Sequence, residues 1–167
     1  MAIVFSSSST ATVRENLPAN TAIYTATAAF DAEESGAITY TLSGTDASLL
    51  TIDASTGEVG VLAGTDYETK QSYSFTVTAT DGSSSQELNV SLNVEDAIEG
   101  TNNDDTYTAT IGDVYDGLGG VDKVTFAGNK SEYEYTVTDK HEVTLIEIST
   151  GNETVLRNVE KIEFADG

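Results

Sequence analysis

Short runs in which apolar and polar residues alternate recur along the chain, and turn residues separate them. The clearest cover residues 38–42, 73–79 and 88–94. This period of two places alternate side chains on opposite faces of a β-strand. Thr, Ser, Val and Tyr dominate the runs, and these residues favour pleated, half-buried surfaces or turns. The spacing of a long amphipathic helix does not occur, so the sequence predicts an all-β fold.

The density of turns divides the chain into two parts. Residues 1–97 hold about seven predicted strands, the density of an immunoglobulin-like Greek-key β-sandwich. Gly and Asp become denser from residue 100 to 120, and long alternating strands follow. We therefore predict a β-sandwich in residues 1–97 and a smaller β-rich domain in residues 98–167.

The chain is strongly acidic. It has 28 Asp and Glu against seven Lys and Arg, a formal net charge of −21. The electrostatic field of so large a negative charge repels phosphate backbones and anionic lipid. We therefore expect no nucleic-acid binding and no direct membrane insertion. The acids form either a solvated surface, as in proteins of salty habitats, or ligand sets for divalent cations. Their ligand-like spacing at turns favours the second interpretation.

The residue types present restrict both the metal and the chemistry. Cys is absent and His141 is the single histidine, which argues against zinc, whereas calcium takes the oxygen ligands that this chain has in excess. A small β domain without disulfides also needs another source of stability, and a metal is a common one. We expect no enzyme, because no nucleophile, base and orienting group can be assembled.

Acids at the turns of the first part fall into two groups if the strands run up and down a sandwich. Crowded carboxylates repel one another unless a cation lies between them. The alternative is that each acid caps its own turn. We favour a metal at both ends, with one group made of Glu15, Asp66, Glu68 and Asp96 and the other of Asp31, Glu33 and Asp81.

The second part carries a different pattern. Asp105, Asp113 and Asp122 each begin an Asp-x-apolar triplet, at intervals of eight and nine residues. Such spacing is typical of a calcium-binding β-roll, in which glycines permit tight turns, the Asp binds the ion and the apolar residue fills the core. Ordinary Gly/Asp hairpin turns remain an equal alternative.

Several motifs in order resemble the cadherin-like repeats of bacterial adhesins, over most of residues 4–96. The resemblance rests on Glu15-Asn16, Asp31-Ala32-Glu33, the run from Leu50 to Val59, Asp66-Tyr67-Glu68, and Ala79-Thr80-Asp81-Gly82. It implies a cadherin-like sandwich that binds Ca²⁺.

The same resemblance implies roles for the acids. Glu15, Asp66, Glu68 and Asp96 would bind calcium at the junction with the next module, and Asp31, Glu33 and Asp81 would complete a site with a preceding one. Glu33 stands where the family has a second Asp, and residues 95–99 lack the full Asp-x-Asn-Asp-Asn run. One junction ion is therefore expected rather than three.

Residues 100–124 resemble the degenerate glycine-rich repeats of RTX secreted proteins. Together the two resemblances imply a secreted or cell-surface module of a bacterial adhesin, a monomer stiffened by calcium and linked to neighbouring modules of a longer chain. The alternative is a calcium-dependent module that binds a cell-surface carbohydrate or peptide. A third possibility is a secretion-signal domain, since the RTX-like part comes late in the chain.

Overall fold

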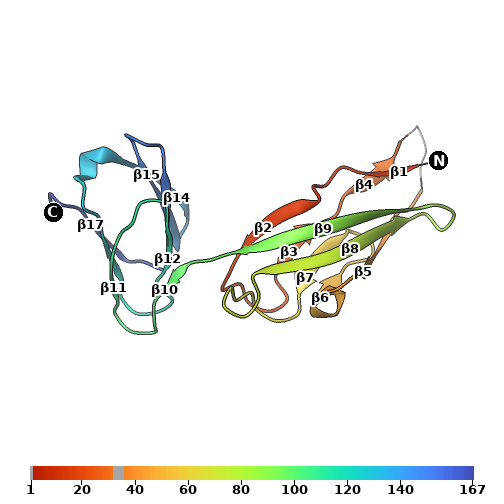
Figure 1. The fold of residues 1–167 in the computed structure, drawn as a ribbon, viewed down its shortest axis with the longest axis horizontal. Helices are drawn as coiled ribbons and strands as arrows, with labels where there is room; N and C mark the ends of the chain where they lie inside the picture. Colours follow the sequence, from red (N-terminus) through yellow and green to blue (C-terminus); the bar gives the residue numbers. More distant parts are fainter. Residues whose placement is uncertain (1, 32–35) are drawn as a thin grey trace. The chain divides into compact units, whose positions relative to one another are not determined.

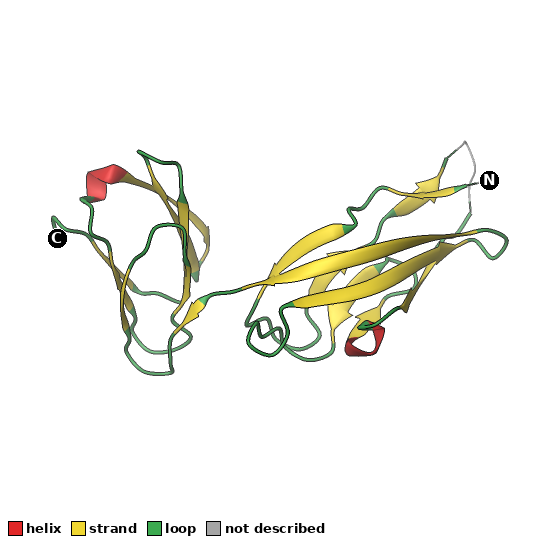
Figure 2. Cartoon of the chain, in the orientation of Figure 1, coloured by secondary structure: helices red, strands yellow, loops and turns green. Residues whose placement is uncertain are grey.

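The computed structural model of the chain describes residues 2–31 and 36–167. The chain divides into two compact units, Met1–Asp96 (unit 1) and Ala97–Gly167 (unit 2). Strands and loops make up nearly all of both units, and the short helical turns are η1 (Ala47–Leu49) and η2 (Lys130–Glu132) (Figure 2). The predicted all-β fold is confirmed. Within the described part, no helix is long and apolar enough to cross a membrane.

Unit 1 is a β-sandwich. Its strands are β1 (Ile3–Phe5), β2 (Thr10–Arg14), β3 (Ala22–Thr25), β4 (Ala28–Phe30), β5 (Thr39–Ser43), β6 (Leu50–Ile52), β7 (Glu58–Val61), β8 (Ser72–Thr80) and β9 (Ser85–Glu95). One sheet has the order β2-β9-β8-β5 and the other β3-β7-β6, while β1 and β4 form a separate pair.

The core of the sandwich follows from alternation in the two long strands, which lie side by side as an antiparallel hairpin (Figure 1). Strand β8 buries Tyr73, Phe75, Val77 and Ala79, and the intervening Ser and Thr residues face outward. Strand β9 buries every second residue from Val90 to Val94. These side chains fill the space between the sheets, as the period of two predicts.

The structure differs from the sequence-based expectation for residues 22–30, which alternate as one run. That run is two strands, because β3 pairs with β7 whereas β4 pairs with β1. Ala26 lies buried between them, and its N–H donates to the carbonyl of Gly57 at 2.9 Å. Ala26 thus marks the point where the chain leaves the sheet of β3.

Strand β2 is the one parallel partner in its sheet, and its register determines what lies at one end of the sandwich. Arg14, the last residue of β2, is paired with Glu95, the last residue of β9. The residues that follow, Glu15 and Asp96, therefore leave the sheet at the same end.

Unit 2 has a different topology. Its strands are β10 (Ile98–Glu99), β11 (Thr106–Thr108), β12 (Val114–Asp116), β13 (Lys123–Thr125), β14 (Tyr133–Asp139), β15 (Glu142–Glu147), β16 (Glu153–Arg157) and β17 (Lys161–Glu163). The sheet orders are β10-β12-β16-β15-β14 and β11-β13-β17. Strands β10 to β13 alternate between the two sheets along the chain, and their pairings are parallel.

The interior of unit 2 is largely aromatic and aliphatic. Tyr115, Val124, Leu145 and Leu156 are buried. Phe126 stacks on Phe164 with ring centroids 5.7 Å apart and meets the edge of Tyr133 at 5.2 Å. Apolar residues two positions after Asp105 and Asp122 point inward, since Tyr107 packs against the core and Val124 lies within it.

Candidate metal centres

The first candidate centre lies at the end of unit 1 where β2 and β9 finish. Glu15 is 2% exposed, and one of its carboxylate oxygens accepts a hydrogen bond of 2.9 Å from the backbone N–H of Tyr67. An oxygen of Glu15 lies within 4.8 Å of an oxygen of Glu68, close enough to share an ion. Burying a carboxylate in this way is costly without a compensating partner.

Asp96 reaches the same end by a different route. The backbone N–H of Glu15 donates to the carbonyl of Glu95 at 3.3 Å, so the chain leaves β9 beside Glu15. The Asp96 side chain is exposed. The structure thus gathers Glu15, Glu68 and the backbone of Asp96 at one end of the sandwich.

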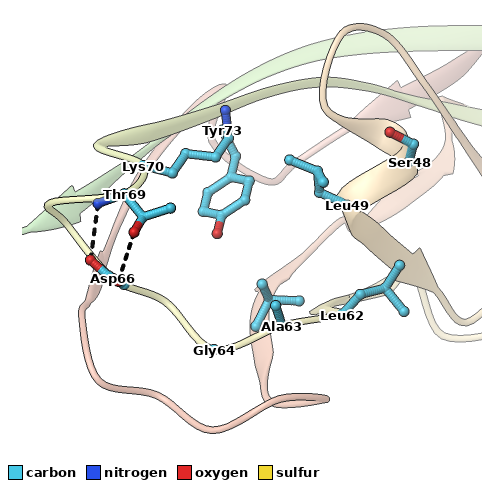
Figure 3. A pocket seen from close by; sticks show the side chains of 10 residues that line it. Ser48, Leu49, Leu62, Ala63, Gly64, Asp66, Thr69, Lys70 and Tyr73 are labelled. Atoms are coloured by element: carbon cyan, nitrogen blue, oxygen red, sulfur yellow. Dashed lines mark hydrogen bonds between the residues drawn. The ribbon is translucent and has the colours of Figure 1, made fainter.

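Asp66 has a local role in the loop between β7 and β8. Its carboxylate accepts hydrogen bonds from the hydroxyl and the backbone N–H of Thr69, at 2.8 and 3.0 Å (Figure 3). These bonds, the hydroxyl first, hold the pKa of Asp66 below its ordinary value. The loop therefore satisfies this carboxylate without a metal.

The acids predicted for the opposite end also have local partners. Asp31 accepts a hydrogen bond of 3.2 Å from the backbone N–H of Ala2. Asp81 accepts one from each of the backbone N–H groups of Ser84 and Ser83, at 2.7 Å, and these lower its pKa. Glu33 lies outside the described residues. Within those residues, neither Asp31 nor Asp81 belongs to a group of three acids close enough to share an ion.

The second candidate centre lies in unit 2, where three acids precede three paired strands. The parallel registers place Thr106 beside Lys123, and Lys123 beside Lys161. The preceding residues are therefore stacked. The N–H of Asp105 donates to Oδ1 of Asp122, and the N–H of Asp122 donates to Oε2 of Glu160, each at 2.8 Å. We call Asp105, Asp122 and Glu160 the acid ladder.

The middle member of the ladder has an unusual environment. Asp122 is 0% exposed, and its Oδ2 is buried without a hydrogen bond. The hydroxyl of Tyr107 is also buried without one. Most buried polar atoms in proteins have such a partner, and a buried charge without one is rarer still.

Two glycines line the space around these atoms. A Cβ on Gly117 would collide with the Asp122 carboxylate and the carbonyl oxygen of Asn158. A Cβ on Gly100 would meet the hydroxyl of Tyr107 and lie 2.8 Å from the carbonyl oxygen of Gly117. Glycine at both positions therefore lets oxygen atoms converge from several turns.

Charges nearby act on Tyr107. Its pKa is raised, first by burial and then by the carboxylates of Asp105, Asp122 and Asp116. Asp116 is itself buried and accepts hydrogen bonds from the Asn158 side chain at 2.7 Å and the N–H of Leu118 at 3.1 Å. The region is thus rich in oxygen and in negative charge, as Ca²⁺ prefers. The residues present fit such an ion.

Asp113 lies apart from the ladder. It precedes β12, which belongs to the other sheet, and its carbonyl accepts from the N–H of Val155 at 3.1 Å. Its spacing in the sequence is the one feature that places it with Asp105 and Asp122.

Glu160 and Asp116 are not among the metal ligands that the sequence predicts. The sequence carries a signal for Glu160. Glu160-Lys161-Ile162 repeats the acid-Lys-apolar order of Asp122-Lys123-Val124, but β14 to β16 separate the two copies in the chain.

Comparison with known proteins identifies the first part of the chain. The cadherin domain family matches residues 9–95. Protocadherin Fat 1 of Homo sapiens is 38% identical in an alignment 108 residues long, which covers 60% of this chain and 2% of that protein. The chain therefore spans a small fraction of the length of this relative.

One solved structure agrees at the level of fold, and a second is similar in sequence over part of the chain. The crystal structure of human protocadherin-24 EC1-2 superposes with a TM-score of 0.52 at 19% identity, covering 94% of this chain and 77% of that one. The solution structure of the third cadherin domain from human protocadherin 7 is 29% identical, covers 57% of this chain and 87% of that one, and has a TM-score of 0.48.

Proposed function

Because the chain belongs to the cadherin family, whose domains are extracellular calcium-binding adhesion modules rather than enzymes, we propose that it is a calcium-stiffened structural unit of a secreted or cell-surface bacterial adhesin. Its cadherin-like sandwich and its smaller β domain would serve as consecutive modules of a longer chain. Their task would be to hold other parts of the adhesin away from the cell.

The buried carboxylate of Asp122 is the observation that carries this proposal. Removing a carboxylate from water costs several kcal/mol unless a partner compensates for it, and Oδ2 of Asp122 has no hydrogen bond. A calcium ion would supply the missing partner. Carboxylates of Asp105 and Asp122, carbonyl groups of Gly117 and Asn158 and the Tyr107 hydroxyl would hold it.

A further ion at the end of the sandwich is supported by Glu15 and Glu68. Their carboxylate oxygens approach to within 4.8 Å although like charges repel, and Glu15 is buried. Asp96 leaves the sheet beside them and would add an exposed ligand. The local hydrogen bonds of Asp66 make it a weaker candidate.

The topology of unit 2 supports the RTX-like interpretation of residues 98–167. Parallel strands that alternate between two sheets, with acids stacked in the turns before them, are what a calcium β-roll requires. The alternative interpretation of residues 100–124 is a set of hairpin turns between antiparallel strands. In unit 2 the antiparallel pairs are β14 with β15 and β15 with β16, which come later in the chain.

Calorimetric titration with calcium tests the proposed function. We expect saturable binding in the range of about 10⁻⁴ to 10⁻³ M at fixed ionic strength, which is typical of extracellular modules. Magnesium at the same concentration is the control, because it demands a smaller octahedral site. Heat signals that are identical for the two metals and never saturate would mean that the acids only attract counterions.

A ligand-binding module is the second candidate, and a pocket in unit 1 favours it. The pocket has a volume of about 200 Å³ and lies between η1 and the loop after β7 (Figure 3). Leu49, Leu62 and Ala63 form its apolar wall, and the ring of Tyr73 points into it. Lys70, whose Nζ lies 5.2 Å from the centroid of that ring, and Asp66 add charge at the rim.

Apolar walls with a few convergent polar groups are typical of binding sites for small groups. Screening the calcium-loaded chain on carbohydrate and peptide arrays tests this candidate. A specific ligand lost in Leu62→Lys but kept in Val4→Lys, which alters an equally exposed apolar residue elsewhere on unit 1, would establish a receptor role.

A further inference from the structure

Unit 2 contains two copies of the same turn, one between β10 and β11 and one between β12 and β13. In each copy an acid comes five residues after a glycine, as Gly100 and Asp105 or as Gly117 and Asp122. The strands before the two turns are paired in parallel, and so are the strands after them. Stacked repeats of this kind place equivalent residues in equivalent surroundings. The two turns can therefore be compared position by position.

The space beside the glycine differs between the two turns. A Cβ on Gly117 would meet a carbonyl oxygen from the following turn and the carboxylate of Asp122, and its three nearest atoms include no hydroxyl. A Cβ on Gly100 would meet the same two kinds of oxygen, the carbonyl at 2.8 Å and the carboxylate of Asp105 at 3.1 Å. The hydroxyl of Tyr107 lies nearer to that Cβ than either of them. An oxygen of the chain thus already fills the position beside Gly100.

The first turn also satisfies its own carboxylate. Oδ2 of Asp105 accepts hydrogen bonds from the hydroxyl and the backbone N–H of Thr101, both at 2.8 Å. In the second turn Leu118 stands in the place of Thr101, and Val124 stands in the place of Tyr107. Neither of these side chains has a hydroxyl. One oxygen of the acid in the second turn is left buried without a hydrogen bond.

These differences decide where a cation is stabilising. A buried carboxylate oxygen without a partner gains most from an ion, whereas Oδ2 of Asp105 has two hydrogen bonds already. An ion also needs room, and in the first turn the Tyr107 hydroxyl takes it. The second turn therefore has both the need for an ion and the space for it.

We propose that Thr101 and Tyr107 restrict unit 2 to a single calcium ion, which lies beside Gly117, although the fold repeats the turn that could hold one. The first turn contributes oxygens to that ion and holds none of its own. This inference rests on the proposed function, and it adds the number of ions and the residues that determine it.

Removing both hydroxyls should create a second site. Thr101→Val and Tyr107→Phe together delete the two hydroxyl groups and keep the shape of both side chains. Equilibrium dialysis counts the ions bound to each chain at fixed ionic strength. The calcium concentration should be about 10 mM, at least tenfold above the dissociation constant of about 10⁻⁴ to 10⁻³ M typical of extracellular modules. The double variant should bind one ion more than the parent.

Thr108→Val with Tyr115→Phe is the matched control, because it deletes the same two kinds of hydroxyl from the same unit. The Tyr115 hydroxyl accepts a hydrogen bond from the N–H of Thr110 at 2.8 Å, outside both turns. Neither double variant alters the net charge of −21, so the counterions that this charge attracts are the same in all three chains. The control should bind as many ions as the parent.

Asparagine substitutions locate the ions. In the parent, Asp122→Asn should remove one ion and Asp105→Asn none, because Asp105 already has its partner in Thr101. In the double variant, Asp105→Asn should remove the added ion. Asp113→Asn controls for the loss of one charge. Tyr107→Phe alone, which deletes a single buried hydroxyl, keeps the test possible if the double variant does not fold, and it too should bind an additional ion.

The possible failures are distinguishable. An unchanged count in the hydroxyl variants would overturn this inference, and so would the loss of an ion from the parent with Asp105→Asn. Either result would leave the calcium site at Asp122 intact. A parent that loses no ion with Asp122→Asn would instead overturn the proposed calcium site, and this inference with it.

Discussion

Asp105 and Asp122 are joined by a single hydrogen bond, in which the backbone N–H of Asp105 donates to Oδ1 of Asp122 at 2.8 Å. The bond uses one oxygen of a fully buried carboxylate and leaves the other, Oδ2, without a hydrogen bond. A group in this state destabilises the fold when it is charged and alone, and stabilises it when a cation is bound.

Asp122→Asn should therefore have effects of opposite sign in chelator and in calcium. Without calcium the substitution removes a buried charge, so the free energy of unfolding of unit 2 should rise by roughly 1 kcal/mol. In calcium at about 100 times its dissociation constant the parent gains about 2.7 kcal/mol, and the variant should lose this gain. Hydrogen exchange of amides in residues 105–125 measures both.

Asp113→Asn is the matched control, because Asp113 precedes a strand of the other sheet. Its exchange pattern should match that of the parent in both conditions. An Asp122→Asn chain that keeps the full calcium protection would remove Asp122 from the site.

Gly117→Ala should damage the same region by steric means. The added Cβ would collide with the Asp122 carboxylate and the carbonyl of Asn158, and overpacking of this kind costs about 1–3 kcal/mol. The Cβ of Gly119→Ala in the same loop would meet only Asn102, with the side-chain oxygen at 3.2 Å and the Cα at an ordinary 3.8 Å, so this change should be tolerated. Calcium titration and thermal melting of the two variants compare them, and equal behaviour would show that the turn is loosely packed.

Glu68→Gln tests the centre in unit 1. In chelator the change should leave stability equal or slightly raised, because it relieves repulsion from Glu15. Calcium affinity at this centre should fall about tenfold, since interactions with a charged group contribute about 1.5 kcal/mol or more. Glu58→Gln, an exposed acid at the start of β7, is the control for loss of charge. The same affinity in all three chains would make Glu68 a surface acid.

The alternation of apolar and polar residues predicted the sandwich well, because the burial of one face of each strand produces that alternation. Strands β8 and β9 bury every second residue, so their sequences alone reveal both strand and face. Residues 22–30 alternate as clearly, yet they form two strands. Their partners, β7 and β1, come from distant parts of the chain, and no local pattern records that choice.

The acids were harder to interpret from sequence, because a carboxylate at a turn serves either a metal or its own backbone. Asp66 and Asp81 satisfy themselves through Thr69 and through Ser83 and Ser84. The short polar residues two or three positions after each acid were the signal for this. The spacing of Asp105, Asp113 and Asp122 could not show which sheet each strand joins. The ladder therefore includes Glu160 and excludes Asp113.

Asp53 should contribute to acid unfolding of unit 1. Its carboxylate accepts hydrogen bonds from the hydroxyl of Ser55 and from the backbone N–H groups of Thr56 and Ser55, which lower its pKa to about 2. A depressed pKa gives stability above the unfolded value of about 3.9 that is lost as the pH falls towards 2. The melting-temperature difference between the parent and Asp53→Ala should shrink over that window. Asp53→Asn, which cannot titrate there, should show no such change relative to Asp53→Ala.

Thermal melting in calcium and in chelator, at one ionic strength, measures whether calcium stabilises the folded chain. We expect calcium to occupy the acid ladder and the Glu15–Glu68 pair. A calcium concentration of about 100 times the dissociation constant should then raise the free energy of unfolding by roughly 2.7 kcal/mol for each site bound in the native state. Such a gain raises the melting temperature by several degrees for a domain of this size. Magnesium or sodium at equal ionic strength should reproduce only the part that comes from screening the net charge of −21. The same melting temperature in chelator and in millimolar calcium would mean that calcium binds neither centre.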